Sequence, residues 1–128
     1  MRPPPSAKPL VERLQAKGGR RLAVLYAPEG LLRLFGADDR LAPVKEAEVV
    51  VAFAATRGEL ERRLAELKNA SSPEAILWLA YPKTTSPRAG DISRDFIHEY
   101  ALTVGLDAVA QIAIDGDFSA LRFMRLGA

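Results

Sequence analysis

The chain has 128 residues, the size of one domain that buries a core without disulfides or a metal ion. It has no cysteine, which excludes disulfide bonds, thiolate metal ligands and thiol nucleophiles. Its 18 basic and 16 acidic residues are interleaved along the chain, which argues against a nucleic-acid-binding surface. Its uncharged runs reach about eight residues, well short of the ~20 of a membrane helix, so we expect a cytoplasmic protein with no membrane contact.

The N-terminal part combines a proline-rich tail with a short helix. Residues 1–8 contain three consecutive prolines, and we expect a disordered tail there and a single domain over 9–128. Pro9 suits the first turn of a helix, whose apolar face includes Leu10 and Leu14. The sequence Lys17-Gly18-Gly19 is predicted to end this helix.

Two nearly continuous apolar runs, over 21–27 and 49–55, predict strands that are covered on both faces. After the first run, Pro28-Glu29-Gly30 forms a turn that leads to a short helix closed by Gly36. Residues 38–47 are predicted to be a connection with a short edge strand near 41–44.

An amphipathic helix follows the second strand. Thr56 and Glu59 form a Thr-x-x-Glu capping box, and Glu59 is also four residues before Arg63, the spacing of a helical ion pair. The apolar face of this helix repeats leucine at positions 60, 64 and 67, which predicts that the helix packs on one face of the sheet.

The run over 75–81 predicts a central strand, which stops at Pro82 before a loop with a lysine and several hydroxyls. Ser93 or Asp91 is expected to cap the next helix, which ends at Gly105. Strands over 108–114 and 119–125 are then joined by the hairpin signal Asp115-Gly116.

This alternation predicts an α/β fold of three layers, a Rossmann-like, mostly parallel five-stranded sheet with an antiparallel last strand. The end of the chain resembles the C-terminal half of the methyltransferase fold, in which the last strand inserts between its two predecessors. By this analogy the sheet order is first, second, third, fifth, fourth.

Four groups of residues together resemble a family of small bacterial proteins classed as a domain of unknown function, with a truncated methyltransferase-like Rossmann core. The resemblance covers about residues 9–125. Its motifs are Pro9-Leu10 with Leu14 and Lys17-x-Gly19, then Ala27-Pro28-Glu29-Gly30, then Leu77-Trp78-Leu79 with Tyr81-Pro82-Lys83, and Asp91-x-x-Arg94-Asp95. The resemblance implies the fold and brings no activity with it.

In an open parallel sheet, ligands bind beyond the carboxyl ends of the strands, and a helix N-terminus near this edge favours an anion. The ligand-binding candidates at this edge are Pro28, Glu29, Gly30, Thr56, Tyr81, Lys83, Thr84, Thr85 and Arg94. Glu29 is the candidate for acid or base chemistry. The alternative interpretation gives these residues structural roles in loops, caps and ion pairs.

The sequence gives little support for a bound cofactor or a metal site. The turn Ala27-Pro28-Glu29-Gly30 has one glycine and a rigid proline where a methyltransferase cofactor would approach the backbone, so we expect no cofactor. His98 is the only histidine and is predicted on the polar face of its helix, and no metal-ligand spacing is present. Two function classes remain: a protein that binds a small anionic ligand, and a non-catalytic module that acts through self-association or a protein partner.

Overall fold

The structure is a computed structural model that describes residues 9–16, 19–35 and 41–127. The predicted tail over 1–8 lies outside these ranges, as do Gly36 and the Lys17-Gly18 part of the predicted helix stop. None of the helices in the described ranges is long and apolar enough to cross a membrane.

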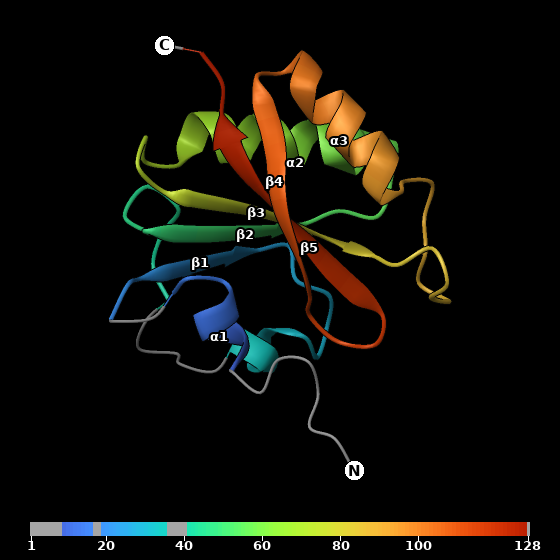
Figure 1. The fold of residues 1–128 in the computed structure, drawn as a ribbon. Coiled ribbons are helices and arrows are strands. Elements are labelled where there is room, and N and C mark those ends of the chain that lie inside the picture. The colour runs from blue at the N-terminus through green and yellow to red at the C-terminus, as the bar shows by residue number, and fades with distance from the viewer. Residues whose placement is uncertain (1–8, 17–18, 36–40, 128) are drawn as a thin grey trace.

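A five-stranded sheet lies at the centre of the described part of the chain (Figure 1). Its strands are β1 (Leu22–Leu25), β2 (Val49–Phe53), β3 (Ile76–Pro82), β4 (Leu106–Ala113) and β5 (Phe118–Arg125). They lie in the order β1-β2-β3-β5-β4, with β1, β2 and β3 parallel and β5 antiparallel to both β3 and β4. The predicted strand order and the antiparallel last strand are confirmed.

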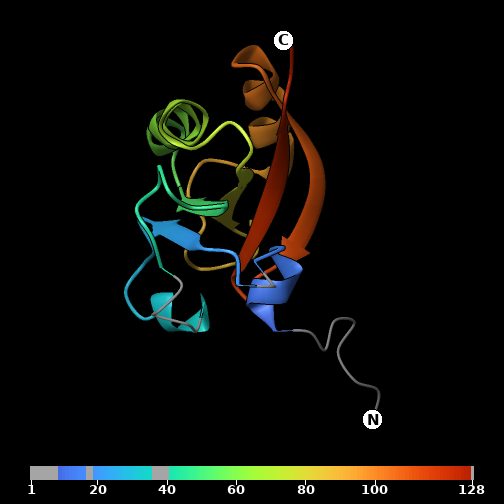
Figure 2. The ribbon, with the colours of Figure 1, turned by 90° about the vertical axis from the view of Figure 1, so that its left-hand side faces the viewer.

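Helical segments cover both faces of this sheet, which gives the three predicted layers (Figures 1 and 2). The helices α2 (Arg57–Ala70) and α3 (Arg94–Thr103) lie on one face. The short helix α1 (Leu10–Arg13) and the 3-10 helix η1 (Leu32–Phe35) lie on the other. Near 41–44 the predicted edge strand is reduced to one bridge, between Leu22 and Leu41.

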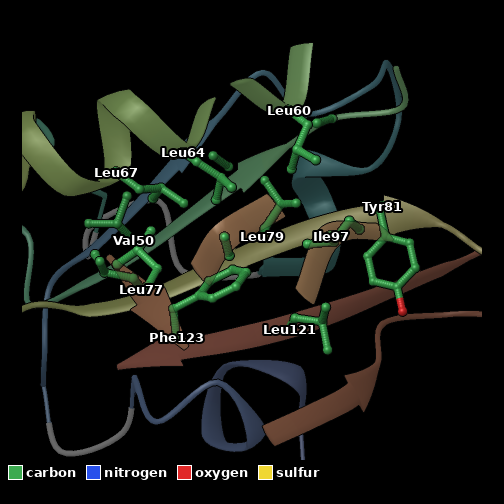
Figure 3. Close-up of a cluster of buried hydrophobic side chains, with 14 of the residues drawn as sticks. Val50, Leu60, Leu64, Leu67, Leu77, Leu79, Tyr81, Ile97, Leu121 and Phe123 are labelled. Carbon is green, nitrogen blue, oxygen red and sulfur yellow. The ribbon is translucent and has the colours of Figure 1, made fainter. Parts of the chain in front are cut away.

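Alternation along β3 separates two hydrophobic clusters. Leu77 and Leu79 point to the α2 and α3 face, where Figure 3 shows them with Leu64 and Ile97. Trp78, between them in sequence, belongs to the cluster under α1 and is 1% exposed. Successive side chains of a strand point to opposite faces, so a continuous apolar run is required when both faces are covered.

The N-terminus of α2 is held by two carboxylates. Thr56 Oγ1 accepts a hydrogen bond from Glu59 N at 3.2 Å, and Glu59 Oε1 accepts one from Thr56 N at 3.3 Å, which confirms the capping box. Asp91, a candidate cap for α3, instead accepts a hydrogen bond from Arg57 N at 2.7 Å, while Ser93 caps α3. The loop before α3 is therefore fixed to the start of α2.

Helix α1 is shorter than predicted because the backbone reverses before the glycines. Gln15 has φ 73°, Gln15 N donates to Glu12 O at 3.0 Å, and Ala16 N donates to Val11 O at 2.8 Å. These are the two hydrogen bonds of a Schellman motif, here with glutamine in the left-handed position. The Leu14 carbonyl, in the same turn, accepts a hydrogen bond from Trp78 Nε1 at 2.9 Å and ties α1 to the sheet.

Candidate functional site

A cavity of about 350 Å³ opens at the carboxyl ends of β1, β2 and β3. We call it the arginine cavity. It is lined by Tyr26, Pro28, Phe53, Ala54, Ala55, Glu59, Arg63, Pro82, Arg88 and Phe118. This is the edge at which ligands bind in open α/β sheets, so its position agrees with the region that the sequence predicts.

Arg63, on α2, has the best-defined charged group of this cavity. Its Nε donates a hydrogen bond to the Phe53 carbonyl at 3.1 Å, and its guanidinium carbon lies 3.6 Å from the centre of the Tyr26 ring. The predicted pairing of Arg63 with Glu59 is wrong, since Glu59 Oε1 accepts instead from the backbone of Ala55 and Thr56. Among the described residues the two terminal nitrogens of Arg63 make no hydrogen bond, so both remain available as donors.

Tyr26 forms one wall of the arginine cavity in a conformation that is uncommon for a residue with a side chain. Its φ is 64°, in the left-handed region, so the chain leaves β1 there rather than at the predicted residue 27. Its hydroxyl donates to Glu66 Oε1 at 2.5 Å, and this hydrogen bond raises the pKa of Tyr26. Strained residues are concentrated at functional sites, where surrounding contacts hold them.

The floor of the cavity is aromatic. The rings of Phe53 and Phe118 meet edge to face with centroids 5.6 Å apart, and both side chains are buried. Arg88 approaches from the loop after β3, with its guanidinium carbon 5.6 Å from the centre of the Phe118 ring. The arginine cavity thus combines two guanidinium groups with an apolar floor.

A second cavity, of about 460 Å³, lies beside β3 toward the edge strand β4. We call it the lysine cavity. It is lined by Tyr81, Lys83, Thr84, Arg94, Gln111, Ile112, Ala113 and Ser119. Lys83 is half-buried, and its Nζ donates a hydrogen bond to the Asp115 carbonyl at 3.0 Å. This lysine therefore helps to hold the turn between β4 and β5.

Tyr81 contributes a neutral hydroxyl to the lysine cavity. Burial raises its pKa above 10, and this effect outweighs the positive charge of Arg94 and the hydrogen bond with Ser119, which both lower it. A tyrosine whose pKa is raised stays protonated through the physiological range. The phenol is therefore available as a hydrogen-bond donor or acceptor and carries no charge.

The candidates from the sequence fall into two places rather than one. Pro28 lines the arginine cavity, and Tyr81, Lys83, Thr84 and Arg94 come together in the lysine cavity. The remaining candidates, which line neither of the two cavities, are Glu29, Gly30, Thr56 and Thr85.

Sequence reasoning missed Arg63, because its helical spacing to Glu59 indicated an ion pair on a solvent-facing surface. It also missed Tyr26, because the residue lies within the apolar run over 21–27 and was therefore predicted to be part of the strand. Only the register of α2 against the end of β1 brings the two side chains together.

Among the described residues, no group of three or more histidine, aspartate and glutamate side chains is placed to hold a metal ion. No protein-family model matches the sequence, and no curated protein matches it.

Solved structures are similar in fold. A ribosomal protein L11 methylase from Lactobacillus delbrueckii subsp. bulgaricus aligns with TM-score 0.55 and 12% identity over 91% of this chain and 75% of the methylase. The PH0226 protein from Pyrococcus horikoshii OT3 aligns with TM-score 0.54 and 10% identity over 90% and 87%. LepI in complex with SAM aligns with TM-score 0.53 and 14% identity over 91% of this chain and 39% of LepI. The chain has a methyltransferase-like Rossmann fold.

The cofactor that this fold implies, S-adenosylmethionine, does not fit the residues present at the sheet edge. The turn after β1 offers Pro28, which has no backbone N–H, and the single Gly30, whose missing Cβ faces open space rather than a cradle. Beyond the end of β2 the loop before α3 covers the Ala55 carbonyl, since a Cβ on Gly90 would lie 1.8 Å from its oxygen. A cofactor needs close approach to these turns, which a proline and a covering loop oppose.

Proposed function

We propose that this protein binds a small anionic ligand in the arginine cavity and that S-adenosylmethionine is not its cofactor. The observation that carries the proposal is the guanidinium of Arg63, fixed by the Phe53 carbonyl and the Tyr26 ring at the mouth of a 350 Å³ cavity. A fixed guanidinium loses little freedom on binding and offers paired donors to a carboxylate or phosphate. Arg88 adds a second positive charge at the same cavity.

The proposal predicts a specific effect of Arg63→Gln. We expect this change to weaken the binding of benzoate or inorganic phosphate about tenfold or more, as measured by titration calorimetry, because the paired donors are lost. Arg62→Gln is the matched control, since Arg62 is the exposed neighbour on α2, does not line the cavity and carries the same charge. Glutamine and arginine have similar helix propensities, so both variants should fold alike.

Thermal unfolding provides the first screen, since a ligand that binds only the folded state raises the midpoint by mass action. Small carboxylates and phosphates are expected to raise it, and S-adenosylmethionine and S-adenosylhomocysteine are not. If Arg63→Gln and Arg62→Gln weaken anion binding equally, the loss comes from the change in net charge alone, and the proposal is contradicted. A clear shift with either S-adenosyl compound would contradict its second part.

Self-association is a second candidate function, favoured by exposed apolar side chains on β4 and β5 and by the open edge of β4. Val109 on β4 is 47% exposed and Met124 on β5 is 56% exposed, and in the described part of the chain β4 pairs only with β5. An open strand edge with apolar residues is a surface on which a second copy pairs.

The self-association proposal predicts a dimer in sedimentation velocity that Val109→Asp converts to a monomer. Leu32→Asp is the control, because Leu32 is equally exposed but lies on η1, away from β4. A monomeric wild-type protein at high concentration would exclude this candidate.

Membership in the small bacterial family and a cytoplasmic location also remain predictions.

A further inference from the structure

The charges that line the arginine cavity do not all have the same sign. Arg63 and Arg88 are cationic, and Glu59 is anionic and lines the same cavity. Glu59 Oε1 accepts hydrogen bonds from Ala55 N at 2.8 Å and from Thr56 N at 3.3 Å. The carboxylate cannot turn away from the cavity without breaking the cap of α2, so its charge is a permanent part of the site.

This arrangement leaves the cavity with a formal charge of +1 from its three ionic side chains. A ligand with one negative charge neutralises this formal charge. A phosphate monoester, whose second proton dissociates at a pKa of about 6, carries nearly two charges near neutral pH and meets repulsion from Glu59. Such repulsion between like charges is strong where water is partly excluded.

The apolar part of the cavity adds a second requirement. Phe53, Phe118 and Pro82 are buried residues that line it, and the edge-to-face contact between the two phenylalanine rings gives a firm aromatic floor. A volume of about 350 Å³ is at the lower end of small-molecule sites, and it suits a ligand with one ring or a short branched chain. An ion without an apolar body makes no contact with this floor.

We propose that the arginine cavity selects a small monocarboxylate with an apolar body and discriminates against phosphate monoesters, with Glu59 as the residue that determines this selectivity. The carboxylate binds the two terminal nitrogens of Arg63, and the apolar body lies against Phe53 and Phe118. This inference rests on the proposed function, since it names the ligand class of the same site.

The test uses three probes of matched shape, measured by titration calorimetry at pH 7.5 and low ionic strength. Phenylacetate is the monocarboxylate, phenyl phosphate is the dianion, and 2-phenylethanol is the uncharged control. We expect phenylacetate to bind at least about tenfold more tightly than either of the others. Acetate, which lacks the apolar body, is expected to bind more weakly than phenylacetate by a similar factor.

Glu59→Gln removes the negative charge of residue 59 and leaves the cap of α2 in place. Glutamine at this position of a capping box still accepts the backbone hydrogen bonds with its amide oxygen, so the cap of α2 is retained. The ratio of phenyl phosphate to phenylacetate affinity is expected to rise about tenfold in this variant. A ratio measured on one protein preparation is insensitive to partial unfolding, since both affinities fall together.

Different results separate a failure of the anion site from a failure of its selectivity. If none of the anions binds, the proposed anion site itself is wrong. If the anions bind and Arg63→Gln weakens them, but phenyl phosphate binds as well as phenylacetate and Glu59→Gln leaves the ratio unchanged, the anion site stands and the selectivity inference is overturned.

Discussion

Trp78→Ala is expected to lower the free energy of unfolding by about 3–5 kcal/mol, the usual cost of truncating a large buried aromatic residue. Trp78 is 1% exposed in the middle of β3, within the cluster under α1. Its Nε1 donates the hydrogen bond to the Leu14 carbonyl that ties α1 to the sheet. For a chain of this size, the loss corresponds to a fall of roughly 10–20 °C in the thermal midpoint.

Trp78→Phe separates the contribution of the buried volume from that of the hydrogen bond to Leu14. Phenylalanine keeps most of the buried volume but cannot donate to Leu14, so we expect a smaller loss of about 1–3 kcal/mol. Chemical denaturation with a constant slope for both variants checks that the folded state is otherwise the same. An alanine variant as stable as the wild-type protein would show that the α1 layer contributes nothing to the fold.

Gly90→Ala is expected to have the second largest effect, on both stability and ligand binding. The added Cβ would lie 1.8 Å from the Ala55 carbonyl oxygen. This clash cannot be avoided by a change of side-chain rotamer, because the opposing atom belongs to the backbone. Forced overpacking of this kind costs about 1–3 kcal/mol or more. Because Ala55 and Arg88 line the arginine cavity, the shift should also weaken anion binding there.

Gly116→Ala is the control for this substitution. Gly116 lies in the turn between β4 and β5, has no atom within 4 Å of an added Cβ and has no left-handed φ. We expect it to change the thermal midpoint little, within the usual range of surface substitutions. If Gly90→Ala is equally mild, the loop before α3 does not press on the Ala55 carbonyl and does not exclude a cofactor from the end of β2.

The fold was largely predictable because its signals are local. The apolar run over 75–81, the capping box of Thr56 and Glu59 and the Asp115-Gly116 turn each determine an element from neighbouring residues. The strand order came from resemblance to a known topology, and it is confirmed. Element ends were predicted less well, since Gln15 and Tyr26 adopt left-handed backbone conformations that no residue preference indicates.

The sequence by itself determined that both faces of the sheet are covered, that α2 begins at a capping box and that a cationic, hydroxyl-rich loop follows β3. Only the tertiary structure decided which cations share a cavity. Arg63 stacks on the ring of Tyr26, which lies 37 positions earlier in the sequence, and Lys83 donates a hydrogen bond to the carbonyl of Asp115, 32 positions later. The physical reason is that strand and helix periodicity are set by neighbouring residues, whereas the contacts of a long charged side chain depend on how separate elements pack.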